Sequence, residues 1–442
     1  MGARETALNV LIACRKEGAW SNERLKSYIL RDKLDRREAA LAARLCYGVQ
    51  QNRLKLDFYL KQLLTGKLKG LHPAVRDILH LGLYQLYETD RIPDSAAVNE
   101  SVGLAKKYCR SVRSAPGLVN AVLRSAVRSR DTLKQPKSLA DRYSHPQKLI
   151  DRLEQSLGRE CLEKMLQANN SAPDLVVQVN TLKTNGEQLQ EVFASEGVSA
   201  RPHSWMKDCL VLSDTGSIEK LKSFEEGLFY VQDPAARLAV LCAQLPEEGA
   251  AVLDCCAAPG GKSFAAAIAM GGKGSIISCD IYEHKTVLIQ KGAQRLGLKN
   301  IRVQLQDASR SCEDWVEKMD TVIADVPCSG YGIIRKKPDI RYKDPDTMKD
   351  LPELQGAILR NAARYVKPGG VLLYSTCTLL REENEQVVQG FLKENPAFYP
   401  EKLPLPDAFE QNNTGMLTLV PGEYDTDGFF ICRLRRKHDV PH

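Results

Sequence analysis

Apolar side chains recur at helical spacing through the first 130 residues. Leu8, Leu11 and Ile12 lie three and four positions apart, and similar runs surround Leu25 and Ile78. Such spacing places apolar side chains on one face of a helix. Helix-interrupting residues fall between the runs at Gly66, Gly70, Pro73, Pro93 and Pro116-Gly117. The pattern predicts an all-helical region of about seven helices.

The pattern changes between residues 134 and 235. Lys134 to His145 has the mixed charge of a linker, and Lys148 to Leu166 predicts a helix. A second helical segment, Gly186 to Phe193, lies among short runs typical of strands. These runs are Leu175–Val179, Cys209–Leu212 and Leu228–Val231. A small α+β domain accounts for this mixture.

Strand-like and helix-like segments alternate after Gln232. The strand-like runs are Ala251–Cys255, Ser275–Cys279, Ile301–Leu305, Thr321–Ala324 and Val371–Tyr374. Helical patterns such as Glu283–Leu296 and Leu354–Tyr365 separate them. Alternation of this kind predicts a mostly parallel, doubly wound α/β sheet of Rossmann type. The chain therefore divides into an all-α domain (1–135), a small α+β domain (145–235) and an α/β domain (236–437).

Composition is that of an ordinary globular chain, with 442 residues, 43% hydrophobic and 26% charged. No apolar run approaches the ~18–20 residues that cross a bilayer. Ala7 to Cys14 is apolar, but no small-residue cleavage site follows it, so we expect no secretory signal. We therefore expect a cytoplasmic protein with no membrane contact, whose thirteen cysteines stay reduced. No C-x-x-C pair or zinc-finger spacing occurs in the sequence, so we expect no metal site. No heptad repeat predicts a dimer, so we expect a monomer.

Charge is unevenly distributed along the chain. Residues 1–140 hold 26 Lys and Arg against 13 Asp and Glu, whereas the remainder has a net charge of −6. Positions 101–140 alone carry nine basic residues and one acidic residue. A contrast of this kind favours nucleic-acid binding. A solvated basic helix face is the simpler alternative, and charge alone does not distinguish RNA from DNA or from an acidic protein.

The first strand of the α/β region leads through a glycine-rich turn into a helix. The turn reads Cys256-Ala257-Ala258-Pro259-Gly260-Gly261-Lys262. Consecutive glycines let the backbone approach a ligand, and a helix start offers free N–H groups. The spacing is neither G-x-G-x-x-G nor Walker A, which disfavours a dinucleotide or a nucleoside triphosphate. A tight turn without a ligand is the alternative.

Two acidic residues follow the next two strands, Asp280 after the second and Asp307 after the third. Ligands of open α/β sheets bind at the carboxyl ends of the strands. Asp280 suits ribose hydroxyls and Asp307 an adenine amino group, although either alone reads as a solvated carboxylate. The glycine turn and both acids, in this order, point to S-adenosylmethionine.

Two cysteines end the fourth and fifth strands. Cys328 lies in Asp325-Val326-Pro327-Cys328, and Cys377 lies in Ser375-Thr376-Cys377. If these strands are neighbours, both loops open on one crevice and the two thiols converge although 49 residues separate them. Strand-end thiols are candidates for reactivity. Cysteines within strand or helix patterns are instead expected in the core, and these are Cys242, Cys255, Cys279 and Cys432.

These loops together resemble the Sun-type family of RNA cytosine-5 methyltransferases. The motifs that carry the resemblance are DCCAAPGGK, ADVPCSG, KPDIR (337–341), STCT with Glu383-Asn384, DTDGFF (425–430) and QDPAA (232–236). The helical N-terminus, with Val98-Asn99-Glu100-Ser101, resembles NusB-type RNA-binding domains. Two positions depart from the family pattern, since Gln178 replaces a common Arg and Tyr331 replaces a common Thr.

The resemblance implies methyl transfer from S-adenosylmethionine to carbon 5 of a cytosine in 16S ribosomal RNA or an early small-subunit precursor. It implies that Cys377 is the nucleophile and that Cys328 assists release of the product. Asp325 is expected to contact the base and, with the glycine turn, Asp280 and Asp307, the cofactor. Lys262 is expected near the methionine tail or the base.

Two other classes of function remain open. A pure RNA-binding or antitermination factor would not need both cysteine loops. A DNA cytosine-5 methyltransferase would use the Pro-Cys position and would not require the Thr376-Cys377 thiol.

Overall fold

The computed structural model describes residues 2–406, 409 and 414–438. The chain folds into two compact units. The N-terminal unit contains residues 1–154, 166–171 and 334–343, and the C-terminal unit contains 155–165, 172–333 and 344–442. In the part of the chain that the structure describes, no helix is both long enough and apolar enough to cross a membrane.

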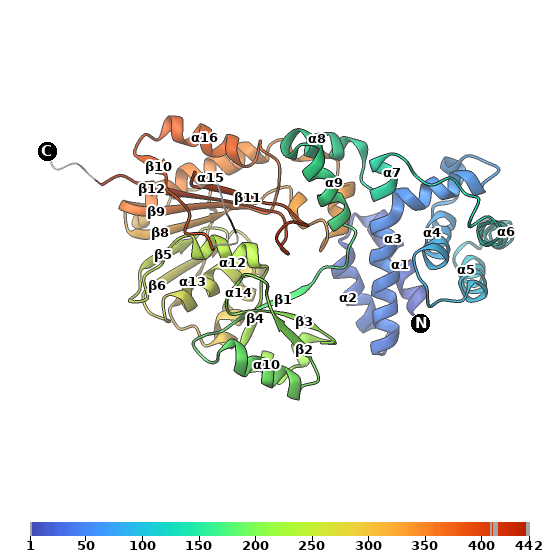
Figure 1. Ribbon diagram of the computed structural model, residues 1–442, viewed down its shortest axis with the longest axis horizontal. Coiled ribbons are helices and arrows are strands. Elements are labelled where there is room, and N and C mark those ends of the chain that lie inside the picture. Colours follow the sequence, from blue (N-terminus) through green and yellow to red (C-terminus); the bar gives the residue numbers. More distant parts are fainter. Residues whose placement is uncertain (1, 407–408, 410–413, 439–442) are drawn as a thin grey trace. The chain divides into compact units, whose positions relative to one another are not determined.

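Six α-helices and one 3₁₀ helix form the described part of the first 130 residues. They are α1 (Ala3–Glu17), α2 (Ser21–Arg31), α3 (Arg36–Leu63), η1 (Leu68–Gly70), α4 (Pro73–Tyr87), α5 (Asp94–Tyr108) and α6 (Ala115–Arg128). Their apolar faces form one core in which the long helix α3 packs with α1 and α4 (Figure 1). Gly48 allows α3 to pack against Tyr84, whose Cζ would lie 1.9 Å from a Cβ atom at that position. The all-helical prediction is confirmed, but Pro116-Gly117 lies in the first turn of α6 and not between helices.

The predicted linker is partly folded. Leu139–Tyr143 form the short helix α7, and the next residues, Ser144 and His145, are buried. The single helix predicted over Lys148–Leu166 is also wrong. Two helices, α8 (Gln147–Leu157) and α9 (Arg159–Ala168), are separated by Gly158, whose φ of +77° ends the first of them.

A ten-residue segment, 334–343, belongs to the N-terminal unit although the chain on both sides of it belongs to the other. Arg341 is fully buried, and its Nη1 donates to Gln51 O at 2.9 Å and to Asn170 Oδ1 at 2.8 Å. Tyr342 donates from its hydroxyl to Gln50 O at 2.7 Å. A buried guanidinium is costly unless it is hydrogen-bonded, so these carbonyl and amide oxygens fix the segment in place.

The middle region forms a four-stranded antiparallel sheet in the order β2-β3-β1-β4. The strands are β1 (Leu175–Val179), β2 (Ser199–Pro202), β3 (Cys209–Ser213) and β4 (Phe229–Val231). Helix α10 (Gly186–Ser195) contributes Phe193, which packs edge-on against Phe229 of β4. The α+β prediction is confirmed. Strand β2 had no sequence signal because its side chains are mostly exposed and carry no apolar alternation.

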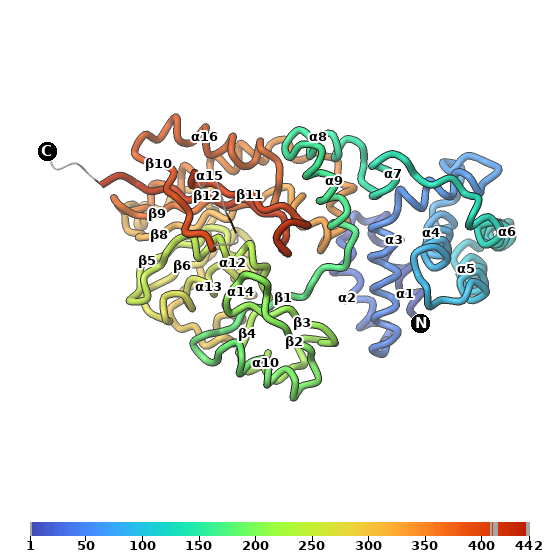
Figure 2. Tube along the Cα trace, in the orientation of Figure 1, coloured from blue at the N-terminus to red at the C-terminus, as the bar shows by residue number. Residues whose placement is uncertain are grey.

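The third region is built on a larger sheet in the order β10-β12-β9-β8-β5-β6-β7, with β11 paired to β12. The central strands are parallel, and β12 is antiparallel to β9. The strands are β5 (Ala251–Asp254), β6 (Ser275–Asp280), β7 (Ile301–Leu305), β8 (Met319–Asp325), β9 (Val366–Thr376), β10 (Phe398–Pro400), β11 (Met416–Leu419) and β12 (Phe429–Arg436). The mostly parallel sheet and the adjacency of the fourth and fifth predicted strands are confirmed (Figure 2).

Helices cover both faces of this sheet, as the doubly wound prediction required. One face carries α12 (Pro234–Leu241), α13 (Gly261–Ala269) and α14 (Glu283–Leu296), and the other carries α15 (Leu351–Tyr365) and α16 (Glu385–Glu394) (Figure 1). Side chains alternate between the two cores, so that Val252 packs with the first set and Leu253 with the second. Residues 407–408 and 410–413 of the predicted α/β domain lie outside the described residues.

Candidate active site

The glycine-rich turn joins β5 to α13. Gly260 has a φ of +111°, and a Cβ atom there would lie 2.3 Å from Phe264 Cζ, so only glycine fits. Ala257 donates from its backbone N to Cys279 O at 2.7 Å, which ties the turn to the end of β6. The residues between Cys256 and Lys262 therefore form the tight turn that the sequence predicted, at the carboxyl end of the sheet.

Both predicted carboxylates lie at the same edge of the sheet. Asp280 ends β6 and accepts from the backbone N of Tyr282 at 3.0 Å. Asp307 follows β7 and accepts from the backbone N of Ser309 at 2.9 Å. The hydrogen bonds from Ser309 lower the pKa of Asp307, which keeps this group ionised. Because β5, β6 and β7 are adjacent and parallel, the turn and the two acids occupy neighbouring strand ends.

The two strand-end thiols converge, as the sequence predicted. Cys328 Sγ and Cys377 Sγ lie 3.0 Å apart, and both residues are free thiols. The backbone N of Cys377 also donates to Cys328 Sγ at 3.3 Å. The hydrogen bond with Cys377 and then burial raise the pKa of Cys328 well above the usual range. Cys328 is therefore a neutral thiol near pH 7, which can donate its proton toward the second sulfur.

Asp325 and Lys262 form a partly buried ion pair that interacts with the thiols. Lys262 Nζ lies 2.7 Å from Asp325 Oδ2, and Ser375 donates to Asp325 Oδ1 at 2.7 Å. Burial alone would lower the pKa of Lys262, but attraction to Asp325, with a smaller effect from Cys377, raises it. Lys262 is consequently a fixed positive charge that interacts with the Cys377 sulfur.

Both residues of the Glu383-Asn384 pair hold the cysteine loops in place by hydrogen bonds. Glu383 accepts from the backbone N of Ser329 at 2.9 Å and from Gln355 Nε2 at 2.8 Å. Asn384 accepts from Thr376 Oγ1 at 2.6 Å and donates to Thr378 O at 3.0 Å. One pair of adjacent residues thus holds both loops. Sequence reasoning missed this role, although a polar pair so soon after Cys377 was a usable signal.

Gly428 of the 425–430 motif and Gly332 pack their backbones directly against each other and against the Cys377 loop. Gly332 donates from its backbone N to Cys377 O at 2.9 Å, and Gly428 donates from its own to Gly332 O at 2.8 Å. A Cβ atom at Gly332 would lie 2.0 Å from Gly428 O. The three chain segments therefore approach so closely that a side chain at Gly332 does not fit.

Replacing Glu383 with alanine tests this bracing. The change leaves the Ser329 N–H without its acceptor, which costs about 1–3 kcal/mol for a buried donor, and removes one of the two acceptors of the Gln355 amide, which keeps Pro327 O. Small displacements of a reacting group reduce rates by as much as about 100-fold, so we expect kcat to fall by about 10- to 100-fold while KM for the substrate changes little. Steady-state kinetics and thermal unfolding measure both effects. Glu383→Gln should recover part of the rate, and Gln386→Ala, on the exposed side of α16, is the matched control; an unchanged kcat in Glu383→Ala contradicts the role.

The two departures from the family pattern are both buried. Gln178 donates from Nε2 to Gln232 O at 3.1 Å and is fully enclosed, as is Tyr331. In this structure both side chains contribute to packing and not to an exposed binding surface. The four cysteines assigned to the core, Cys242, Cys255, Cys279 and Cys432, are buried as predicted. Within the described residues, no cluster of three or more His, Cys, Asp or Glu side chains could hold a metal ion.

Comparisons with known proteins match all three regions. Residues 241–435 match the family described as 16S rRNA methyltransferase RsmB/F, residues 1–128 match the NusB family, and residues 145–219 match the RsmF/B-like ferredoxin-like domain. The crystal structure of PH0851 superposes with a TM-score of 0.80 at 26% identity, covering 98% of each chain.

Curated relatives match over almost the whole chain. The probable ribosomal RNA small subunit methyltransferase B of Bacillus subtilis (strain 168) is 38% identical over 98% of this chain and 98% of its own length. The ribosomal RNA small subunit methyltransferase B of Klebsiella pneumoniae (strain 342) is 32% identical over 93% of each chain. The fold, the converging strand-end loops and these full-length similarities agree, and the chain belongs to the 16S rRNA methyltransferase RsmB/F family.

Proposed function

We propose that this protein transfers a methyl group from S-adenosylmethionine to carbon 5 of a cytosine in 16S ribosomal RNA through a covalent cysteine–cytosine intermediate. The observation that carries the proposal is the pair of thiols, 3.0 Å apart, at the ends of two adjacent parallel strands. A methyltransferase acting on oxygen or on an amine needs no nucleophilic thiol, whereas the unreactive C5 position needs one.

The strand ends fit the proposed methyl donor. Gly260 and Gly261 place no side chain at the start of α13, whose first turn offers backbone N–H groups. Asp280 has the place and the acceptor oxygens to bind ribose hydroxyls, and Asp307 has those to accept from an adenine amino group. When bound, S-adenosylmethionine supplies an electrophilic methyl group. Asp325 and residues 256–262 complete the proposed binding set.

Cys377 is the proposed nucleophile. Its sulfur adds to C6 of the cytosine, which moves the electron pair of the C5–C6 double bond to C5 and makes C5 able to attack a methyl group. The neutral Cys328 thiol and the Lys262 ammonium both stabilise negative charge on the Cys377 sulfur. Asp325 lies at the end of β8 between Lys262 and Ser375, where it can orient the ring edge of the base.

Cys328 is proposed to end the reaction. After methyl transfer, the proton on C5 must leave so that the C6–S bond breaks and the aromatic ring is restored. Once Cys377 is bonded to carbon, its hydrogen bond no longer raises the pKa of Cys328, so Cys328 more readily releases its own proton to solvent; the resulting thiolate then takes the C5 proton as the C6–S bond breaks. The same thiol thus acts first as a hydrogen-bond donor and then as the proton acceptor.

RNA is the proposed substrate, held in part by residues 1–135 and 145–235. The net charge of +13 over residues 1–140 suits a phosphate backbone. Removing residues 1–130 would also remove Gln50 and Gln51, which accept from Tyr342 and Arg341. Point substitutions are therefore a cleaner test of RNA binding than a deletion.

Nucleoside analysis tests the proposed reaction. The full chain is incubated with transcribed 16S rRNA, or with small subunits at different assembly stages, and isotopically labelled S-adenosylmethionine. We expect label in 5-methylcytidine after digestion to nucleosides. Label in any other nucleoside contradicts the C5 assignment.

A further inference from the structure

A basic, aromatic groove lies on the N-terminal unit. It has a volume of about 520 Å³ and is bordered by α1, Trp20 just before α2, α3, η1, α4 and the 337–343 segment. Five cationic side chains and two carboxylates line it. The cations are Arg15, Arg53, Lys69, Arg76 and Lys343, and the carboxylates are Asp77 and Asp339. Arg15 pairs with Asp77 and Arg76 pairs with Asp57. Arg53, Lys69 and Lys343 therefore carry the excess positive charge of the groove, in a chain region that is itself basic.

Aromatic rings alternate with the cations. Lys343 Nζ lies 3.7 Å from the centre of the Trp20 ring, and Lys337 Nζ lies 5.9 Å from it. The guanidinium of Arg53 lies 5.0 Å from the centre of the Tyr342 ring. Positive groups beside partly exposed rings are the features of sites that bind single-stranded nucleic acid, where bases stack and phosphates pair with cations.

One wall of the groove is built before any ligand arrives. Asp339 accepts from Ser21 Oγ at 2.6 Å, and the buried Arg341 anchors the same segment. Lys343 is therefore held at the groove, and burial together with the charge of Lys337 lowers the pKa of Lys343. An anion between the two lysines would relieve their repulsion.

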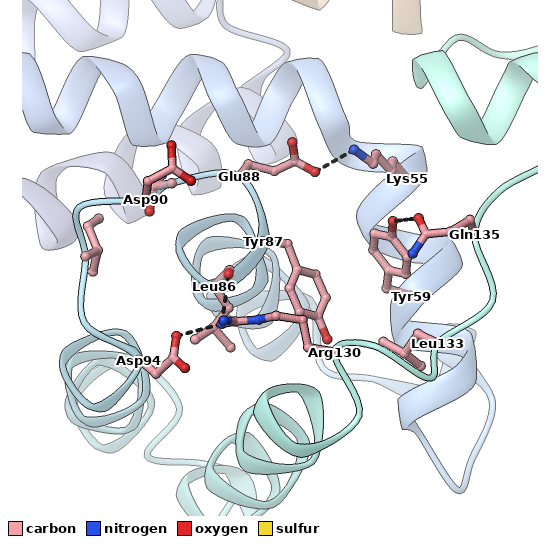
Figure 3. Close-up of a pocket in the computed structure, with 12 residues that line it drawn as sticks. Lys55, Tyr59, Leu86, Tyr87, Glu88, Asp90, Asp94, Arg130, Leu133 and Gln135 are labelled. Carbon is pink, nitrogen blue, oxygen red and sulfur yellow. Dashed lines mark hydrogen bonds and ion pairs between the residues drawn. The ribbon is translucent and has the colours of Figure 1, made fainter.

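A second cavity of the same unit has the opposite character. It has a volume of about 570 Å³ and is lined by two cations and three carboxylates. Lys55 pairs with Glu88 at 2.6 Å and Arg130 pairs with Asp94 at 2.7 Å, as Figure 3 shows. Its cations are engaged and its balance is acidic, so it does not suit a polyanion.

Resting on the proposed function, we propose that the basic groove binds a single-stranded segment of the RNA substrate, with a base against Trp20 and phosphates against the surrounding cations. The 337–343 wall continues the chain that leaves the Cys328 loop, so RNA in the groove contacts a segment only nine residues after that cysteine. The groove, and not the basic stretch 101–140, is then the principal RNA contact of the unit.

Binding of a short fluorescein-labelled single-stranded RNA to full-length variants tests the proposal. We expect Lys69→Glu with Lys343→Glu to weaken binding about tenfold or more and to flatten its dependence on salt. Trp20→Ala should weaken it about tenfold, and Trp20→Phe should recover most of that loss. RNA should also quench part of the tryptophan fluorescence, and Trp20→Phe should remove that quenching while Trp205 and Trp315 remain. Thermal unfolding checks that each variant is folded.

The matched control reverses two exposed charges of the 101–140 stretch, Arg110→Glu with Arg113→Glu. If the groove variants bind RNA with wild-type affinity while this control loses RNA binding, the proposal for the groove is overturned and the proposed function stands. Binding of polyglutamate, a mimic of an acidic protein, is measured with the same variants. If the groove variants lose polyglutamate binding but keep RNA binding, the groove binds an acidic protein and the proposal is overturned. Failure of the wild-type protein to form 5-methylcytidine is separate, since it contradicts the proposed function whatever the groove binds.

Discussion

Replacing Cys377 with serine should abolish methyl transfer to deproteinised 16S rRNA. Serine keeps the size and a hydrogen-bonding group, but a hydroxyl is far less acidic than a thiol and does not form the anion that adds to C6. The 3.0 Å contact with Cys328 and the field of Lys262 stabilise a thiolate and do not raise an alcohol to comparable reactivity. We expect the rate to fall by at least about 10⁴-fold, as when other enzymes lose their nucleophile. Incorporation of labelled methyl groups measures it.

The control for this prediction separates chemistry from binding. Cys377→Ser should bind RNA with wild-type affinity because Cys377 directly follows β9, is only partly buried at the margin of the core, and is replaced by a side chain of similar size. Cys432→Ser, a change to a buried strand cysteine on β12, should lower stability without removing the reaction. Activity that survives in Cys377→Ser would falsify the nucleophile assignment and would move that role to Cys328.

The central strands β8 and β9 were predictable because most of their residues are buried on both faces of the sheet. The edge strand β7 and helix α14 also have the bounds that the pattern predicted. The convergence of Cys328 and Cys377 followed from parallel strand order alone. That prediction depended on the position of both cysteines at strand ends and not on the residues around them.

The sequence did not predict contacts that join distant segments through polar groups. Arg341 is a charged residue in a short 3₁₀ stretch, and such residues are rarely buried, so nothing in the pattern placed it inside the N-terminal unit. Gln50 and Gln51 accept from the 341–342 pair through their backbone carbonyls, which leave no mark in the sequence. Glu383 likewise braces a loop 54 residues away.

These unpredicted contacts bear on how the site is organised. The Cys328 loop is held on one side by Glu383, and a few residues later the chain enters the segment that Arg341 fixes in the N-terminal unit. Within the C-terminal unit, the hydrogen bonds of Glu383 to Ser329 and Gln355 leave the Cys328 loop little conformational freedom to lose when substrate binds, which favours a preorganised thiol pair.

Replacing Cys328 with alanine should accumulate a covalent protein–RNA adduct. The variant retains Cys377, so addition to C6 and methyl transfer continue, but the proton on C5 has no acceptor and the C6–S bond persists. We expect a slowly migrating, RNase-sensitive band on a denaturing gel. The double variant Cys328→Ala with Cys377→Ser should show no band, because the bond to carbon cannot form.

The pH dependence of adduct breakdown gives a sharper test of the same role. In the adduct the hydrogen bond from Cys377 is gone, but burial still raises the pKa of Cys328, so the fraction present as the thiolate that accepts the C5 proton grows as pH rises toward that pKa. The wild-type adduct should therefore decay faster with increasing pH, whereas decay in Cys328→Ala should be slow and nearly independent of pH. Equal decay rates and equal pH profiles in the two proteins would assign proton removal to another group and leave Cys328 only as the hydrogen-bond partner of the nucleophile.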